Sequence, residues 1–371
     1  MFSSLGRQCP NDYNPAEYYL TQLASATSSN GDGKKDNSEF VDKCIRAFQQ
    51  STYNQLLMGT ITDIKQIPYN ELSFAMKYNE FISSESQKES ELDSNFFRQM
   101  KWLLWRAFKS GARDPVRTTS LLLRSLIPAM IVGIIYFQSA KTPQTVQNSN
   151  AIVHITLGTN CITNSFVVLA TFPAAMKIFL RERKRRLYNT GAYYLTKLIA
   201  DLPFFILMPL LYSIIIYWLV GYRTDWRFFL LFCSTTVLAT LASVAFHHII
   251  AALAQTIDDA VSFALPFIET AVLFTGFMIN NASIPIYFKW FQYATWFYYA
   301  FSVILIGLWA PIANIPSCKF EEYCFQSGKE VLQHYAIPVK MFWFDLTMLF
   351  VLIIAYHLIA FGIVLIRAKR S

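Results

Sequence analysis

The stretch 176–203 reads MKIFLRERKRRLYNTGAYYLTKLIADLP and separates two apolar runs, at 152–175 and 202–220. Five of the six residues from Arg181 to Arg186 are basic, and Glu182 is the exception. A cationic cluster between two apolar runs of spanning length is typical of a short cytoplasmic loop in a multi-pass membrane protein. The sequence therefore predicts an integral membrane protein with this loop on the inner side.

The composition supports this interpretation and excludes two alternatives. The chain has 371 residues, of which 54% are hydrophobic, and its net charge is +8. The mean hydropathy is +0.32, and the apolar residues come in blocks, which is unusual for a soluble domain. The positive charge flanks these blocks, so membrane orientation explains it more simply than nucleic-acid binding. The first 20 residues have no apolar core, so no cleavable signal peptide is expected there.

The apolar blocks predict an all-α membrane protein with six transmembrane helices. Arg367, Lys369 and Arg370 directly follow the last apolar run, which places the C-terminus inside. The N-terminal region is also predicted inside, so the number of crossings must be even. The apolar run 291–309 is therefore interpreted as a re-entrant segment that enters from outside and returns. The predicted spans are about 118–137, 152–175, 202–220, 228–254, 260–279 and 342–366, with a re-entrant and outer region at 280–341 within a transmembrane domain of residues 118–371.

An amphipathic helix is predicted at 94–117, between a cytoplasmic segment at 1–93 and the first span. Phe97, Met100, Leu104 and Phe108 recur at helical spacing, and basic residues occupy the other faces. Such a helix can lie on the inner leaflet. An ordinary soluble surface helix is the alternative, and the adjacent span favours the membrane interpretation.

Several polar residues fall inside the predicted spans. Asn160 and Thr163 share a helical face of the second span, and Glu269 lies in the fifth. Polar groups in a span face the bundle or a cavity and often mark a functional site. For the second span, structural hydrogen bonds between helices are an equal alternative, whereas for Glu269 a role in a cavity is favoured over such a bond. The spacing of Cys318 and Cys324 suits a disulfide in an outer, oxidising loop. The sequence shows no zinc pattern, so no metal site is expected.

Three motifs carry a resemblance to a known family. They are CPNDYNPAEYY at 9–19, RERKRRLYNTGAYYLTKLIADLP at 181–203 and TGFMINNASIPIYFKWFQYATWFYYAF at 275–301. Together they resemble the G subfamily of ABC transporters, and White-type half transporters most closely. The resemblance runs in order from Met1 to Arg370. It implies a transmembrane domain of the ABC-2 type, preceded by the tail of an ATP-binding domain and a linker at 1–93.

The resemblance also implies roles for particular residues. Half transporters of this family pair as homo- or heterodimers, and substrate lies between the second and fifth spans of the two copies. Phe277 and Met278 match an apolar plug between an inner and an outer cavity. Glu269 departs from the family, in which that position is usually apolar, and this argues against a purely lipid-like substrate. The implied cavity residues are Asn160, Thr163, Glu269, Val272, Phe277 and Met278, and the implied coupling residues toward the ATPase are Arg181, Glu182, Arg183, Lys184, Arg185, Arg186 and Tyr188.

The ATP-binding motifs of the family do not occur in this sequence. There is no G-x-x-x-x-G-K-[ST] and no LSGGQ-like signature, so the chain by itself is expected to bind no ATP or Mg²⁺ and to be no ATPase. It is expected to be either a fragment of a longer gene product or a protein that has lost its motor. In the first case it would be the membrane half of a transporter of pigment precursors, sterols or lipids. In the second it would be a membrane interaction protein that regulates full half transporters.

The expected surroundings follow from the same reasoning. The partners would be the bilayer, a second half transporter and a small-molecule substrate, but no nucleic acid. The expected location is the plasma membrane or an intracellular vesicle membrane, with both termini cytoplasmic.

Overall fold

The computed structural model divides the chain into two units, Met1–Glu89 and Ser90–Ser371. The structure describes residues 43, 45–52, 54–59, 95–113, 115–139, 145–185, 187–222, 225–315 and 325–370. In the first unit the described residues are mainly helical. The rest of the fold concerns the second unit.

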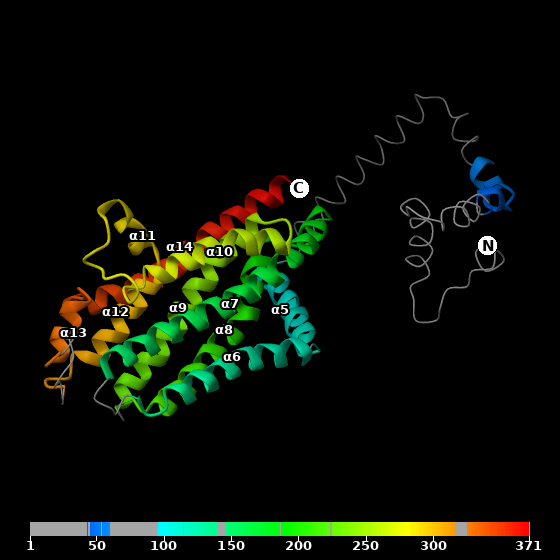
Figure 1. Ribbon diagram of the computed structural model, residues 1–371. Helices are drawn as coiled ribbons and strands as arrows, with labels where there is room; N and C mark the ends of the chain where they lie inside the picture. Colours follow the sequence, from blue (N-terminus) through cyan, green and yellow to red (C-terminus); the bar gives the residue numbers. More distant parts are fainter. Residues whose placement is uncertain are drawn as a thin grey trace, which may run out of the picture. The chain divides into compact units, whose positions relative to one another are not determined.

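The second unit is built from helices, and its described residues include no strand. This confirms the predicted all-α class. Long helices lie side by side in a bundle, and shorter ones gather near one end of it (Figure 1). The helices are α5 (Phe96–Ala112), α6 (Pro115–Ile135), α7 (Thr145–Lys184), α8 (Thr190–Val220), α9 (Trp226–Leu253), α10 (Ile257–Leu273), α11 (Lys289–Ala294), α12 (Trp296–Trp309), α13 (Gly328–His334) and α14 (Phe342–Arg370), with 3₁₀ turns at Ile286–Phe288 and Val339–Met341.

Five of the described helices are long and apolar enough to cross a membrane: α6, α7, α8, α9 and α14. A sixth candidate is the segment Ile286–Trp309, in which α11 and α12 meet at a bend of 79°. Such a bend occurs in re-entrant loops and in broken spans, so the predicted re-entrant path stays a prediction. The helix α10 has 17 residues, or about 25 Å, somewhat less than the ~30 Å of bilayer hydrocarbon. The chain is thus a multi-pass membrane protein.

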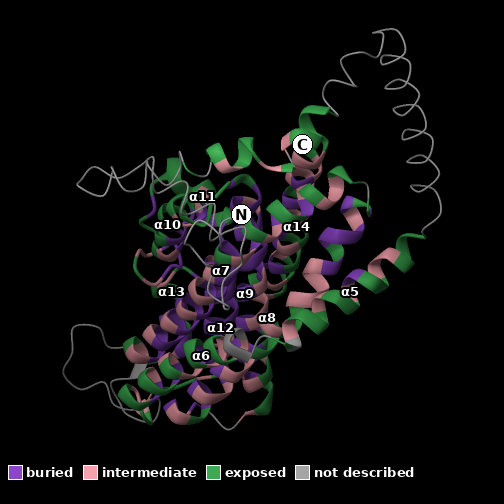
Figure 2. Ribbon diagram, turned by 90° about the vertical axis from the view of Figure 1, so that its right-hand side faces the viewer, coloured by how far each residue is buried: buried purple, intermediate pink, exposed green. Residues whose placement is uncertain are grey.

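The centre of the bundle is formed by α7 and α9, where buried residues concentrate (Figure 2). Small polar side chains allow these helices to approach closely, as is common between membrane helices. The hydroxyls of Ser165 and Ser243 lie 2.8 Å apart between α7 and α9. Around this pair, α14 packs on α9, α6 packs on α8, and α5 also contacts α8.

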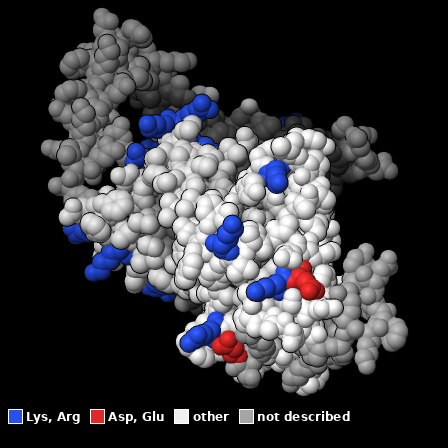
Figure 3. Space-filling model, turned by 90° about the vertical axis from the view of Figure 1, so that its left-hand side faces the viewer, with Lys and Arg blue, Asp and Glu red and all other residues white. Residues whose placement is uncertain are grey.

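The outer surface of the bundle is largely apolar, which agrees with contact with lipid. On α6 and α14, for example, the exposed residues include Ile131, Ile134, Ile354 and Leu358. Charged side chains are sparse on the face shown in Figure 3 and are separated by wide uncharged areas.

Two predicted boundaries need correction. The stretch 176–203 is not mainly a loop, because α7 continues to Lys184 and α8 begins at Thr190. The predicted fifth span at 260–279 also ends early, with the last residue of α10 at Leu273. Hydropathy marks where a chain is apolar, whereas a helix extends as far as its backbone hydrogen bonds continue.

The end of α10 is fixed by the turn that follows it. Gly276 has a φ of +96°, a left-handed conformation that glycine adopts without strain. A Cβ added there would lie 2.8 Å from Oδ1 of Asn281. The Nδ2 group of Asn281 donates to the carbonyl of Tyr335 at 2.9 Å, which ties the turn to the segment after α13.

Candidate coupling and substrate sites

The amphipathic helix α5 is joined to the end of α7 by a bidentate salt bridge. Nη1 of Arg106 donates to Oε1 of Glu182 at 3.0 Å, and Nη2 donates to Oε2 at 3.2 Å. Two parallel bonds of this kind hold a guanidinium and a carboxylate in one orientation. The hydrogen bond to Glu182 raises the pKa of Arg106 above its usual value, so the guanidinium keeps its charge.

Tyr188, in the short segment between α7 and α8, completes this contact. Its hydroxyl donates to Oε2 of Glu182, and its carbonyl accepts from Nη1 of Arg183 at 3.2 Å. Burial raises the pKa of Tyr188, and the hydrogen bond to Glu182 raises it further. The phenol therefore stays protonated and remains a donor at physiological pH.

A second contact holds the start of α8 against α5. The backbone N–H of Asn189 donates to Oε1 of Gln99 at 2.9 Å. Beneath it, the rings of Phe179 and Tyr193 stack with centroids 4.3 Å apart and planes inclined by 16°. The turn from α7 to α8 thus rests on an aromatic base and is tied to α5 at two points, so a movement of α5 would carry the turn with it.

The remaining predicted coupling residues surround this contact. Arg181, Lys184 and Arg185 are exposed, and Arg183 is half-buried. Arg181, Arg183 and Lys184 lie in the last turn of α7, where basic residues interact favourably with the helix dipole, and Arg185 directly follows it. Arg186 lies outside the described residues. Sequence reasoning missed Arg106, although the isolated acid Glu182 among five basic residues was a signal that a specific cation would approach it.

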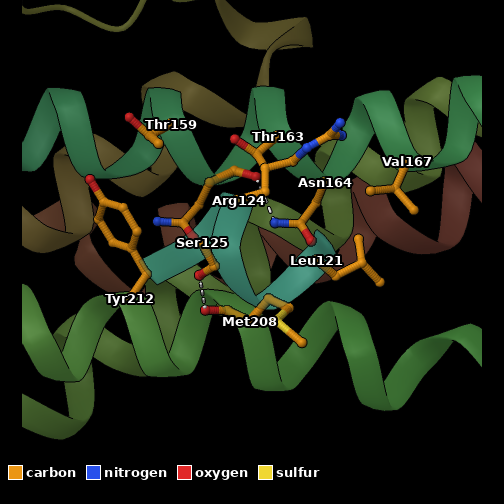
Figure 4. A pocket seen from close by; sticks show the side chains of 10 residues that line it. Leu121, Arg124, Ser125, Thr159, Thr163, Asn164, Val167, Met208 and Tyr212 are labelled. Atoms are coloured by element: carbon orange, nitrogen blue, oxygen red, sulfur yellow. Dashed lines mark hydrogen bonds between the residues drawn. The ribbon is translucent and has the colours of Figure 1, made fainter. Parts of the chain in front are cut away.

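The predicted cavity residues of α7 line a small pocket between α6, α7 and α8. Asn160 is buried, and its Nδ2 donates to the carbonyl of Thr156 at 2.9 Å. Thr163 is half-buried and projects toward α6 (Figure 4). The void has a volume of about 10 Å³, which is at the lower limit for one water molecule. The pocket in this single chain is therefore too small for a substrate; its lining consists of Leu121, Arg124, Ser125, Thr159, Asn160, Thr163, Asn164, Val167, Met208 and Tyr212.

The predicted cavity residues of α10 and of the turn after it lie elsewhere. Glu269 and Met278 are exposed, while Val272 and Phe277 are half-buried. Phe277 stacks on His154 of α7 with ring centroids 5.0 Å apart, so the turn after α10 contacts α7, although His154 is not one of the predicted cavity residues. None of these four residues lines the pocket beside Asn160, and their common role in a substrate cavity stays a prediction.

Two of the six cysteines lie within the described residues. Cys161 and Cys233 are buried and free. Cys318 and Cys324 lie outside the described residues, so their predicted disulfide stays a prediction. Among the described residues, no group of three His, Cys, Asp or Glu side chains is placed to hold a metal ion.

Comparison with known families identifies the architecture. The family model described as ABC-2 type transporter matches residues 98–309, more than half of the chain. The chain belongs to the ABC-2 type transporter family. The part of this ABC-2 chain that matches includes most of α5, the turn from α7 to α8, and the bent pair α11 and α12.

Similar proteins agree with the family and extend the match to the whole chain. Protein white of Ceratitis capitata is 28% identical over 100% of this ABC-2 chain and 52% of its own length. The ABC transporter ATP-binding protein/permease wht-1 of Caenorhabditis elegans is 28% identical over 100% of the chain and 55% of its own length. The broad substrate specificity ATP-binding cassette transporter ABCG2 of Rattus norvegicus is 23% identical over 82% of the chain and 47% of its own length. The ABC-2 chain therefore spans about half the length of the curated relatives that it matches.

Proposed function

We propose that this chain is the transmembrane half of a G-type ABC transporter that moves amphipathic small molecules. The match along the whole chain to proteins whose names describe an ATP-binding protein/permease supports this proposal. The substrates would be pigment precursors, sterols or lipids. ATP-binding domains would supply the energy, and a second half transporter would complete the pathway across the membrane.

The observation that carries the mechanism is the contact of Arg106 with Glu182 and Tyr188. In the proposed mechanism, closure of the ATP-binding domains pushes on α5 and on the turn from α7 to α8. Because Arg106 and Gln99 bind that turn from α5, the two elements would move together. Their movement would tilt α7 and α8 and alternate the access of substrate to the cavity. Both termini and this turn are proposed to lie on the cytoplasmic side of the membrane. That membrane is either the plasma membrane or the membrane of an intracellular vesicle.

The orientation has a direct test. A single reactive cysteine at Leu187, an exposed position in the turn, should react with a membrane-impermeant maleimide only after the cell is permeabilised. The matched control is a single reactive cysteine at Trp226, an exposed position at the start of α9. This cysteine should react in intact cells. Labelling of position 187 from outside an intact cell would overturn the topology and the function that depends on it.

The transport proposal is tested with a chimera. The ATP-binding half of a relative such as protein white, joined ahead of residue 95, should give ATP-dependent uptake of an amphipathic dye into inside-out vesicles. Glu182→Gln should reduce uptake while leaving ATP binding intact. Arg98→Gln, which changes an exposed arginine of α5 that forms no ion pair with Glu182, should leave uptake unchanged. ATP hydrolysis by the purified chain alone, or uptake unaffected by Glu182→Gln, would contradict the proposal.

The role of Glu269 is tested in the same chimera. We expect Glu269→Gln to change uptake or selectivity among dyes of different charge. A carboxylate in a membrane helix is energetically costly, and such residues often mark a functional site. Unchanged uptake and selectivity would remove Glu269 from the substrate site.

A further inference from the structure

Arg124 is the only charged residue between Thr118 and Phe137, and its setting differs from that of most charged residues in membrane helices. Such residues usually face the bundle interior and pair with an opposite charge. Arg124 is exposed, and it forms no ion pair with a carboxylate in the described part of the chain. It lies nine residues after Pro115, or about 14 Å along α6 from the end at which the helix begins.

Polar groups of α7 surround the base of this side chain. Thr163 and Asn164 line the pocket together with Arg124. Figure 4 shows the guanidinium extending past them toward Val167, in the direction of the end of α7 that carries the basic cluster. The hydroxyl of Thr163 makes no hydrogen bond to any described residue, so it is free to donate. The arrangement offers a cation and a neutral donor side by side, and among the described residues no carboxylate pairs with the cation.

An apolar stripe continues from Arg124 along the same face of α6. Ile127, Ile131, Ile134 and Ile135 follow at helical spacing, and all four are more than half exposed. The stripe leads away from the end at which α6 begins and toward the opposite side of the bilayer. A cationic side chain followed along the helix by an exposed apolar stripe is complementary to an anionic headgroup followed by an acyl chain.

We propose that Arg124 and Thr163 bind the headgroup of an anionic phospholipid in the bilayer half where α6 begins, with one acyl chain along the isoleucine stripe of α6. The pocket itself cannot take the ligand, because its void holds one water at most. The headgroup instead lies at the surface of the bundle, against the guanidinium. The inference requires only that the chain spans a membrane, so it can fail without affecting the proposed transport function.

The test uses photoreactive lipids and the purified chain in phosphatidylcholine vesicles. A phosphatidylserine and a phosphatidylcholine, each carrying the same diazirine in one acyl chain, are cross-linked, and labelled peptides from residues 125–139 are quantified by mass spectrometry after chymotryptic digestion. We expect the phosphatidylserine to label this segment about five-fold more than the phosphatidylcholine, the size of effect expected for one Lys or Arg at an anionic surface.

Three variants make the test specific. Arg124→Gln should bring the ratio of phosphatidylserine labelling to phosphatidylcholine labelling close to one. Arg124→Lys should keep most of the preference for phosphatidylserine. Arg227→Gln, which removes an exposed arginine at the other end of the bundle, should leave it unchanged. Far-UV circular dichroism checks that each variant is folded.

Several outcomes would overturn the inference. One is a ratio near one in the unchanged chain, which decides the matter even if Arg124→Gln does not fold. Another is the same ratio in Arg124→Gln as in the unchanged chain, or an equal fall in Arg227→Gln. Soluble glycerophosphoserine should not compete at the concentration of the lipid probe. If it competes equally, the site recognises the headgroup alone and the proposed contact of the acyl chain with the isoleucine stripe is wrong.

Discussion

The ion pair between Arg106 and Glu182 should contribute measurably to holding α5 against the bundle. The Arg106 side chain is 54% exposed and that of Glu182 is 23% exposed, so solvent screens the pair. Exposed pairs contribute about 0.2–1 kcal/mol. Because both guanidinium Nη atoms bind the carboxylate, the upper end of that range applies. We expect a coupling energy of about 1 kcal/mol between Arg106→Gln and Glu182→Gln.

The measurement is a double-mutant cycle based on hydrogen exchange. The chain and its single and double variants are placed in lipid nanodiscs, and the opening free energy of α5 is obtained from deuterium uptake of its peptides by mass spectrometry. If the two single substitutions acted independently, their factors on the exchange rate would multiply. A coupling energy of this size makes the exchange rate of the double variant differ from that product by about five-fold. Tyr188 keeps its hydrogen bond in Glu182→Gln through the glutamine oxygen, so the cycle reports mainly the ionic contact.

The control is the same cycle with Arg98→Gln in place of Arg106→Gln. Arg98 is an exposed arginine of α5 and forms no ion pair with Glu182, so its effect should add to that of Glu182→Gln. The reasoning is refuted if the Arg106 cycle is also additive within about 0.3 kcal/mol, the usual scatter for independent sites.

Three further predictions concern the chain between Gly276 and Asp345. Gly276→Ala should lower the unfolding free energy in mixed detergent micelles by about 1–3 kcal/mol, because alanine is strained at a φ of +96°; Gly158→Ala, whose added methyl meets nothing within 4 Å, should be neutral or stabilising, and equal losses would contradict the argument. Ser302→Ala should cost about 1–3 kcal/mol in the same assay, because it removes the 2.6 Å hydrogen bond to the buried carboxylate of Asp345; an unchanged midpoint would show that another donor replaces it. Peptide mapping without reductant should find Cys318 and Cys324 joined and two hydrogen atoms lighter, and free thiols at both positions in protein from the cell surface would disprove the disulfide.

The sequence determined the class of this protein because membrane insertion depends on local properties. Runs of about 20 apolar residues and the basic cluster at 181–186 act through their own transfer free energies, and each can be recognised without knowledge of its neighbours. The same holds for the amphipathic helix at 94–117, whose periodicity lies within a few turns. These features predicted the all-α, multi-pass architecture and the region in which α5 and the basic turn would occur.

Tertiary structure decided which of these residues meet. Arg106 and Glu182 are 76 positions apart, and nothing in the local pattern selects Arg106 over Arg98 or Lys101. The end of α10 at Leu273 depends on the turn at Gly276 and on Asn281, not on hydropathy. The exposure of Arg124 depends on how α6 packs on α8 and beside α7. Contacts between distant segments follow from the packing of whole helices, which depends on all their side chains together.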